Sequence, residues 1–332
     1  MKGKGREHSR KGEGLPGEFQ LIDRLVAGLP RSRRTILGPG DDCAILAPGR
    51  ARTLVTIDSM VEGVHFNLRW GTPEQVGARA LAVNLSDIAA MGGTPTSCVV
   101  NLAIRPGIAM RFLDRVYAGL RRAARASGVD VVGGNITSAR EVAITIALLG
   151  DAPVRPLLRS SARPGDDIFV TGTVGDAALG WRILAGKMRA IGATRRHLVA
   201  RYLAPTARLF AGQRLARLCP VPAAIDISDG LLQDLGHLVD RSGVGAELDP
   251  ESVPVSKAYA QVMGSDLGLA LGGGEDYELL FCARAGRTER DLSRLLRVPT
   301  RRIGRIVRGC GVHLQGGLRA RIEGWDQMRP RS

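Results

Sequence analysis

The chain has 332 residues, of which 44% are hydrophobic and 24% charged, and this length and composition predict a globular protein of two domains. Its longest apolar stretch, residues 142–150, is far shorter than the roughly 20 residues of a membrane-spanning helix, so we expect no membrane partner. Five cysteines without a CxxC pair argue against a disulfide framework and against a zinc site. We expect a cytoplasmic protein with reduced cysteines and a disordered basic tail over residues 1–16, which lack the apolar stretch of a secretory signal.

The formal net charge of +15 makes nucleic-acid binding an alternative that has to be weighed. Only five of the 47 basic residues are lysines, and the arginines are scattered along the whole chain with few aromatic residues among them. This distribution is not the clustered basic patch that neutralises phosphates. We therefore expect no nucleic-acid partner.

The first half of the chain, residues 17–150, predicts one domain. Its expected elements are a strand, two helices and two further strands, over residues 53–58, 72–93, 109–128, 129–134 and 141–150. The first helix carries Thr72 as its N-cap, Pro73 in its first turn and a Gly-Gly stop at 92–93. Asp87 then falls inside this helix beside Val83 and Met91, on a largely apolar face where a solvated carboxylate is not expected.

A proline-punctuated connector at 151–166 leads to a second predicted domain over residues 155–332. It restarts with a strand, a helix, another strand and another helix, over residues 167–172, 177–186, 221–228 and 231–243. A Gly-rich loop with acidic residues and a strand follow at 272–281. The order of elements is mixed α/β in both halves.

Acidic residues recur in both halves at strand ends, in a helix interior and in Gly-rich turns, namely Asp42, Asp58, Asp87, Asp226, Asp229 and Glu275. Taken singly, each has a plainer explanation: the acids at 41–42 could solvate a turn, and Asp229 or Ser228 could cap the following helix. The stretch at 272–276 could be a flexible hairpin tip, and His65 a partly buried histidine with no ligand. Together, these oxygen ligands in a basic protein suit Mg²⁺.

The standard nucleotide-binding and hydrolase motifs are missing from the sequence: it has no GxxxxGK[ST] loop, no protein-kinase catalytic loop, no GxGxxG fingerprint between a predicted strand and a helix, and no GxSxG elbow. Several Mg²⁺ ions between carboxylates and polyphosphate oxygens could replace the lysine of a phosphate-binding loop.

Eight motifs carry a resemblance that spans residues 17–328: "GPGDDCAIL", "TIDSMVEGVHF", "ALAVNLSDIAAMGG", "VVGGN", "LLRSSARPGD", "AIDISDGLLQDLGHL", "GGGEDYELLF" and "EGWD". In order and spacing, the chain resembles the thiamine-monophosphate kinase family of the aminoimidazole ribonucleotide synthetase and selenophosphate synthetase superfamily. The resemblance implies a two-domain α/β (α+β) fold with mixed sheets packed with helices. It also implies phosphorylation of thiamine monophosphate by ATP, and a homodimer joined through the N-terminal domains, with the active site between N- and C-terminal domains.

The resemblance also implies the roles of individual residues. The metal positions are Asp42, Thr56, Asp58, Asp87, Asp226 and Asp229. The nucleotide positions are Gly134, Asn135, Arg159 and Ser228, and the positions that hold thiamine monophosphate are His65, Glu275 and Trp325. Because the acceptor is already a phosphate anion, we expect direct in-line transfer without a covalent enzyme nucleophile.

Two residues depart from the family pattern at metal positions. Asn135 stands where many relatives have Asp, and Ile57 stands where a hydroxyl residue often precedes the strand-end Asp, which leaves only its backbone carbonyl. Both departures leave the number of bound Mg²⁺ ions open.

Other members of the superfamily and a non-enzymatic module are the alternatives. A selenophosphate synthetase should carry a reactive Cys in an N-terminal Gly-rich loop, but no Cys precedes Cys43. The hydrogenase-maturation relative should end in a functional Cys, whereas this chain ends "MRPRS". A catalytically inactive metal- or RNA-binding module would tolerate loss of the acids, which are all present here.

Overall fold

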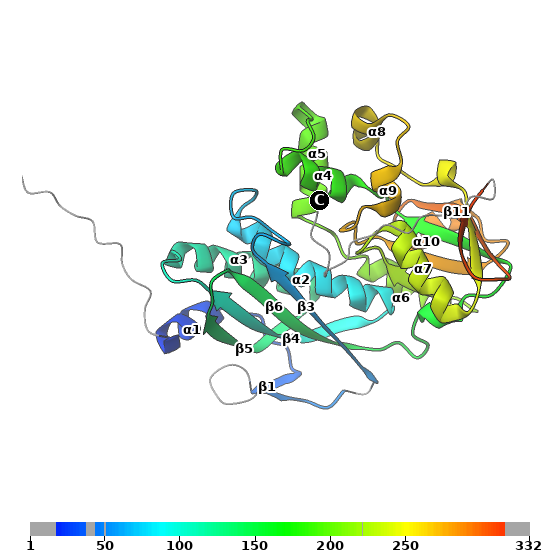
Figure 1. The fold of residues 1–332 in the computed structure, drawn as a ribbon. Coiled ribbons are helices and arrows are strands. Elements are labelled where there is room, and N and C mark those ends of the chain that lie inside the picture. The colour runs from blue at the N-terminus through cyan, green and yellow to red at the C-terminus, as the bar shows by residue number, and fades with distance from the viewer. Residues whose placement is uncertain (1–17, 38–43, 50, 221, 316–332) are drawn as a thin grey trace, which may run out of the picture.

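The computed structural model describes residues 18–37, 44–49, 51–220 and 222–315. Its first half contains α1 (Glu18–Val26), β1 (Thr35–Leu37), β2 (Ile45–Leu46), β3 (Thr53–Val61), α2 (Pro73–Ala90), β4 (Thr94–Ile104), α3 (Met110–Ser127), β5 (Asp130–Ser138) and β6 (Ala143–Asp151). Four of these strands form a sheet in the order β3-β6-β4-β5, in which only β4 and β5 are parallel. Helices α2 and α3 lie over one face of it (Figure 1).

Helix α2 begins as the sequence predicts. Thr72 and Gln75 form a capping box, with Pro73 in the first turn. The helix packs so tightly on α3 that a Cβ at Gly77 would lie 1.9 Å from the carbonyl oxygen of Val116. Only glycine permits this approach, which buries α2 deeply against its neighbour.

The second half is built on a six-stranded sheet in the order β12-β9-β11-β7-β10-β8, in which only β12 and β9 are parallel. Its strands are β7 (Asp166–Thr171), β8 (Ala223–Asp226), β9 (Gly245–Leu248), β10 (Leu279–Arg284), β11 (Thr300–Val307) and β12 (Gly311–Leu314). Its helices are η1 (Arg159–Ser161), α4 (Asp176–Leu184), α5 (Gly192–Leu203), α6 (Leu209–Leu215), α7 (Leu231–Ser242), η2 (Pro250–Ser252), α8 (Lys257–Met263), α9 (Gly268–Gly272) and α10 (Glu289–Leu296).

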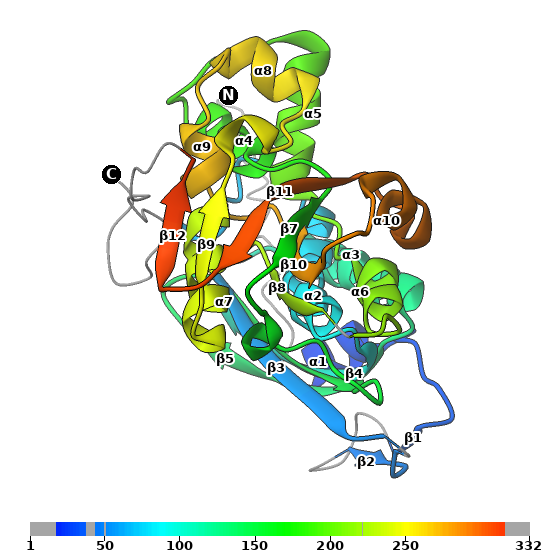
Figure 2. The same ribbon diagram turned by 90° about the vertical axis from the view of Figure 1, so that its right-hand side faces the viewer.

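Apolar side chains cover both faces of this sheet. On one face, Ile168 and Val170 pack with residues of α4 and α7. On the other, Phe169 stacks on Phe281 at 5.4 Å between ring centroids, and residues of α6 and α10 pack around this pair. Figure 2 shows these two helices on the same side of the sheet. The last turn of α2 belongs to this second core, so one helix contributes to the cores of both halves.

The predicted fold class, with mixed sheets packed with helices, is confirmed, and the predicted helices and strands of both halves are present. Several boundaries were wrong. Strand β3 continues to Val61, because residues beyond Asp58 keep pairing with β6, so Asp58 lies inside the strand and not at its end. Strand β5 continues to Ser138, because residues beyond Gly134 keep pairing with β4. Strand β8 ends at Asp226, because its pairing with β10 stops there, and Gly272 ends α9 rather than opening a loop.

The predicted tail at residues 1–16 lies outside the described residues, and the proposed domain boundaries stay predictions. No helix in the described part of the chain is long and apolar enough to cross a membrane.

Candidate active site

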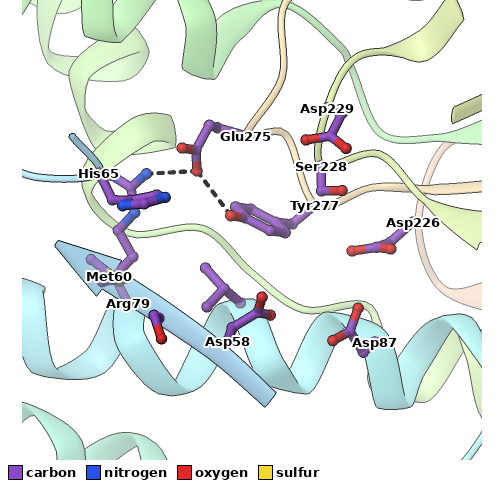
Figure 3. A pocket seen from close by; sticks show the side chains of 12 residues that line it. Asp58, Met60, His65, Arg79, Asp87, Asp226, Ser228, Asp229, Glu275 and Tyr277 are labelled. Carbon is purple, nitrogen blue, oxygen red and sulfur yellow. Dashed lines mark hydrogen bonds and ion pairs between the residues drawn. The ribbon is translucent and has the colours of Figure 1, made fainter. Parts of the chain in front are cut away.

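A pocket lies where α2 and β3 face the end of β8 and the segment that precedes β10 (Figure 3). Its walls include five of the predicted acidic residues, Asp58, Asp87, Asp226, Asp229 and Glu275. His65 and Ser228 line it as well. The fold therefore gathers residues that are spread over more than 200 positions of the sequence into a single site.

Asp58 and Asp87 meet because β3 runs alongside α2. Side chains alternate along a strand, so Thr56 and Asp58 share the face of β3 that looks toward the helix. The Thr56 hydroxyl donates a hydrogen bond to the Asp87 carboxylate. One turn earlier on α2, the Asn84 side-chain oxygen accepts the backbone N–H of Asp58 at 3.1 Å.

Asp226 is brought to the same place by the second half of the chain. It is the last residue of β8 and only 3% exposed. The hydroxyl of Ser86 donates to its carboxylate at 2.7 Å. Since Ser86 and Asp87 are adjacent in α2, this helix holds carboxylates of both halves together.

The electrostatics of this cluster favour a divalent cation. Burial, followed by the charges of Asp87 and Asp226, raises the pKa of Asp58 to about 7. Burial and the charge of Asp87 likewise raise the pKa of Asp226 to about 7. None of the ion pairs between described residues includes Asp58, Asp87 or Asp226. Crowded oxygen ligands without a direct cationic side chain fit Mg²⁺.

The loop after β8 is organised by a residue that the sequence analysis missed. The Asp234 carboxylate in α7 accepts the backbone N–H groups of Ser228, Asp229 and Gly230, each at 3.1 Å. Gly230 is the N-cap of α7 and the cap has no side-chain hydrogen bond, so the alternative of Ser228 or Asp229 as cap is wrong. Their side chains line the pocket instead. The signal available in the sequence was an acid in the first turn of the helix that follows Gly230.

A second set of ligating atoms lies beside this loop. Asp229, Asp234 and His237 place one possible metal-ligand atom each within 4.8 Å of one another. Burial raises the pKa of Asp229, and the charge of His237 opposes that rise. The three backbone donors to Asp234 all reach its Oδ2, and Asp229 is the member of this group that lines the pocket.

The Gly-rich segment is packed rather than a flexible hairpin tip. A Cβ at Gly274 would lie 2.2 Å from the carbonyl oxygen of Ser228. The backbone N–H groups of Glu275 and Tyr277 donate to the carbonyls of Ser228 and Ile227, each at 2.8 Å. These bonds fix the segment against the loop after β8, and they aim the side chain of Glu275 at the pocket.

Arg79 and Tyr277 are two further pocket residues that the sequence analysis missed. The Arg79 Nη2 donates to Glu275 Oε2 at 2.7 Å, and the Tyr277 hydroxyl donates to the same oxygen at 2.8 Å (Figure 3). His65 lies near them, with its Nδ1 accepting the backbone N–H of Val61 at 3.1 Å. Nothing in the local sequence marks these contacts, because the Arg79–Glu275 pair joins residues 196 positions apart.

Three of the remaining predicted residues do not line the pocket within one chain. Ile57 is 65% exposed on the face of β3 opposite to Asp58. Asn135 lies on β5, at the other edge of the sheet from β3, and donates to the side chain of Asn101 at 3.2 Å. A Cβ at Gly134 would lie 2.2 Å from the carbonyl oxygen of Val100, so strand packing alone requires this glycine.

Arg159, also predicted to contact the nucleotide, is exposed at the start of η1 and does not line the pocket. It nevertheless acts on the cluster, because its charge lowers the pKa values of Asp87 and Asp226 against the effect of burial. Asp42 and Trp325 lie outside the described residues.

Comparisons with known proteins agree with this architecture. Residues 40–152 match the AIR synthase related protein N-terminal domain, and residues 163–316 match the C-terminal domain of the same family. Thiamine-monophosphate kinase of Aquifex aeolicus is 36% identical over 316 residues, which cover 94% of this chain and 98% of that protein.

Two solved structures are similar as well. The crystal structure of thiamine-monophosphate kinase from Stenotrophomonas maltophilia matches with a TM-score of 0.81 and 37% identity, covering 91% of this chain and 97% of that one. The structure of AaThiL complexed with AMPPCP and TMP matches with a TM-score of 0.76 and 35% identity, covering 93% and 96%. With its two AIR synthase related domains, this chain belongs to the thiamine-monophosphate kinase family.

Proposed function

We propose that the protein transfers the γ-phosphoryl group of ATP to thiamine monophosphate and releases ADP and thiamine diphosphate. The observation that carries the proposal is the pocket in which Asp58, Asp87 and Asp226 meet Glu275 and His65. The names of the related proteins support it. The related structure that is a complex with AMPPCP and TMP supports it as well.

The carboxylates would hold Mg²⁺ at one end of the pocket. Asp58, Asp87 and Asp226 form the buried part of this ligand set, and Asp229 extends it along the loop after β8. Mg²⁺ held by these residues would supply positive charge against the polyphosphate. Thr56 keeps Asp87 in place through its hydroxyl, and Ser86 does the same for Asp226. Asp42 is proposed as a further ligand on the family resemblance alone.

The other end of the pocket would hold thiamine monophosphate. An ionised carboxylate only accepts hydrogen bonds, so Glu275 suits a ligand that carries amino donors and a positive charge, as thiamine does. His65 and Trp325 are proposed to complete this site. Since the acceptor is a phosphate anion, the residues have to align two anions and screen their repulsion, and Arg159 supplies positive charge for this.

A second copy of the chain is proposed to cover the outer face of the four-stranded sheet. Within the described residues this face exposes large apolar side chains, with Val55 70%, Ile57 65% and Val99 38% exposed. Such a patch is typical of an interface. Asn135 lies at the edge of the same sheet, so the geometry of a dimer formed there would determine whether Asn135 of one chain reaches the pocket of its partner.

We also propose that the protein functions in the cytoplasm.

The test is an assay of the purified protein with ATP and Mg²⁺, with and without thiamine monophosphate. We expect ADP release to require thiamine monophosphate and to stop when EDTA removes the metal, with thiamine diphosphate formed in an amount equal to ADP. Equal ADP release in both reactions, or an absence of thiamine diphosphate, would contradict the proposal. A control with thiamine in place of its monophosphate should release no ADP above background.

A further inference from the structure

We infer that Arg79 is a positioning residue for thiamine monophosphate, because it holds the Glu275 carboxylate at the pocket. The inference rests on the proposed function and goes beyond it, since nothing in the family resemblance assigns a role to Arg79. It starts from a buried ion pair that joins the two halves of the chain, with Arg79 on α2 and Glu275 before β10.

The surroundings of Arg79 are unfavourable for a residue that serves stability alone. Its side chain is 3% exposed, and its guanidinium lies 3.9 Å from the ring centroid of Tyr202. Nε and Nη1 are buried and have no hydrogen-bond partner among the described residues. Desolvating a cation and leaving donors unsatisfied is costly, and an apolar side chain would fill the same space without that cost. What the guanidinium provides is an ion pair with Glu275 at 2.7 Å and a cation–π contact with the ring of Tyr202.

Side-chain contacts hold the segment that carries Glu275 in addition to its backbone hydrogen bonds. Glu275 and Tyr277 adopt φ values of +77° and +52°, in the left-handed region that residues with a side chain rarely occupy. Conformations of this kind persist when the surrounding contacts over-determine them. Here Arg79 Nη2 and the Tyr277 hydroxyl both donate to Glu275 Oε2, which fixes this carboxylate from two sides.

The place of Arg79 on α2 links the two ends of the pocket. Arg79, Val83 and Asp87 follow one another at helical spacing, and all three line the pocket. At a rise of 1.5 Å per residue, Arg79 and Asp87 are about 12 Å apart along a single rigid helix. The helix thus sets the distance between the carboxylate cluster and Glu275, and a packed helix changes this distance very little.

The experiment is a double-mutant cycle with Arg79→Met and Glu275→Gln, measured by steady-state kinetics and by calorimetric binding of thiamine monophosphate. We expect Arg79→Met to raise KM and Kd for thiamine monophosphate by about tenfold, with KM for ATP within about twofold of wild type. Arg79→Lys keeps the charge and should recover part of the loss. In the Glu275→Gln background, Arg79→Met should add less than about a further twofold, because the carboxylate through which it acts is already gone.

Arg302→Met is the matched control, since it also removes an arginine–carboxylate pair, at 2.7 Å from Asp167 and away from the pocket. It should leave both KM values unchanged. The inference is overturned if Arg79→Met raises the two KM values equally, if its effect multiplies fully with that of Glu275→Gln, or if it behaves like the control. Should Arg79→Met not fold, Tyr277→Phe removes the other donor to Glu275 and must raise KM for thiamine monophosphate selectively. A wild-type protein without thiamine-monophosphate-dependent ADP release would instead refute the proposed function.

Discussion

Replacing Asp87 by asparagine removes one charge from the carboxylate cluster and keeps a side chain of nearly the same shape. The carboxamide oxygen can still accept the hydrogen bond from Thr56. We therefore expect the Asp87→Asn variant to fold. Because it loses a proposed Mg²⁺ ligand, its turnover should fall by about two orders of magnitude or more.

The same change should stabilise the protein in the absence of metal, and the pKa of Asp58 gives the magnitude. In the folded protein it is raised from 3.8 to about 7, so the folded state keeps a proton that the unfolded chain releases between these pH values. The free energy of unfolding therefore falls as the pH rises through this range. At about 1.4 kcal/mol per pH unit, the loss for Asp58 reaches about 4 kcal/mol above pH 7.

Burial is the largest cause of this rise in pKa and the charge of Asp87 is the second. Removing that charge should accordingly restore about 1–2 kcal/mol at pH 8, which corresponds to an increase in Tm of about 2–6 °C. At pH 5 the gain should be small, because Asp58 and Asp226 are largely protonated there in both proteins.

The assay is thermal unfolding of both proteins at pH 5 and pH 8, with EDTA and then with Mg²⁺ and ATP. Wild type should gain more from Mg²⁺ and ATP than the variant does. The shared-cluster interpretation is refuted if the variant keeps near-wild-type turnover. It is also refuted if the metal-free variant melts below wild type at pH 8.

Three further changes test other parts of the proposed site. Trp325→Ala should raise KM for thiamine monophosphate about tenfold, as expected for a lost cation–π contact, with little change in KM for ATP or in Tm. A lower Tm with both KM values unchanged would show that Trp325 is a structural anchor. Asn135→Asp should lower the Mg²⁺ concentration for half-maximal activity if a second chain brings this position to the site, and an unchanged titration would exclude that. Deletion of residues 1–15 should leave turnover unchanged, and a large loss would show that this segment helps to form the site or the dimer.

The sequence predicts well what short-range patterns encode. The start of α2 at Thr72 follows from its capping residues, and an acid inside that helix indicated a buried site at Asp87. The β-branched residues at 53–58 predicted the start of β3 at Thr53. These features depend on neighbours within a few positions, which is why no structure is needed to see them.

Contacts between distant segments are what the sequence conceals. In the sequence, nothing distinguishes Arg79 from other helix residues. Its role becomes visible only through its contact with Glu275, 196 positions away. The family resemblance makes Gly134 a nucleotide position. In the structure, however, a glycine is required there because β4 approaches the backbone too closely for a side chain. The role of Asp234 is hidden for a similar reason, because it depends on how the backbone turns between β8 and α7.

Helix α2 packs in the cores of both halves, and this affects how the chain folds during synthesis. Ala89 and Ala90 at the end of this helix pack with Phe169, Leu215 and Leu279, which leave the ribosome much later than the helix does. Until those residues arrive, the end of α2 remains exposed to water. The first half of the chain should therefore not reach its full stability alone, and the two halves should unfold in one cooperative transition. In hydrogen exchange, the amides of α2 should be among the last to exchange, since they open only when both cores open.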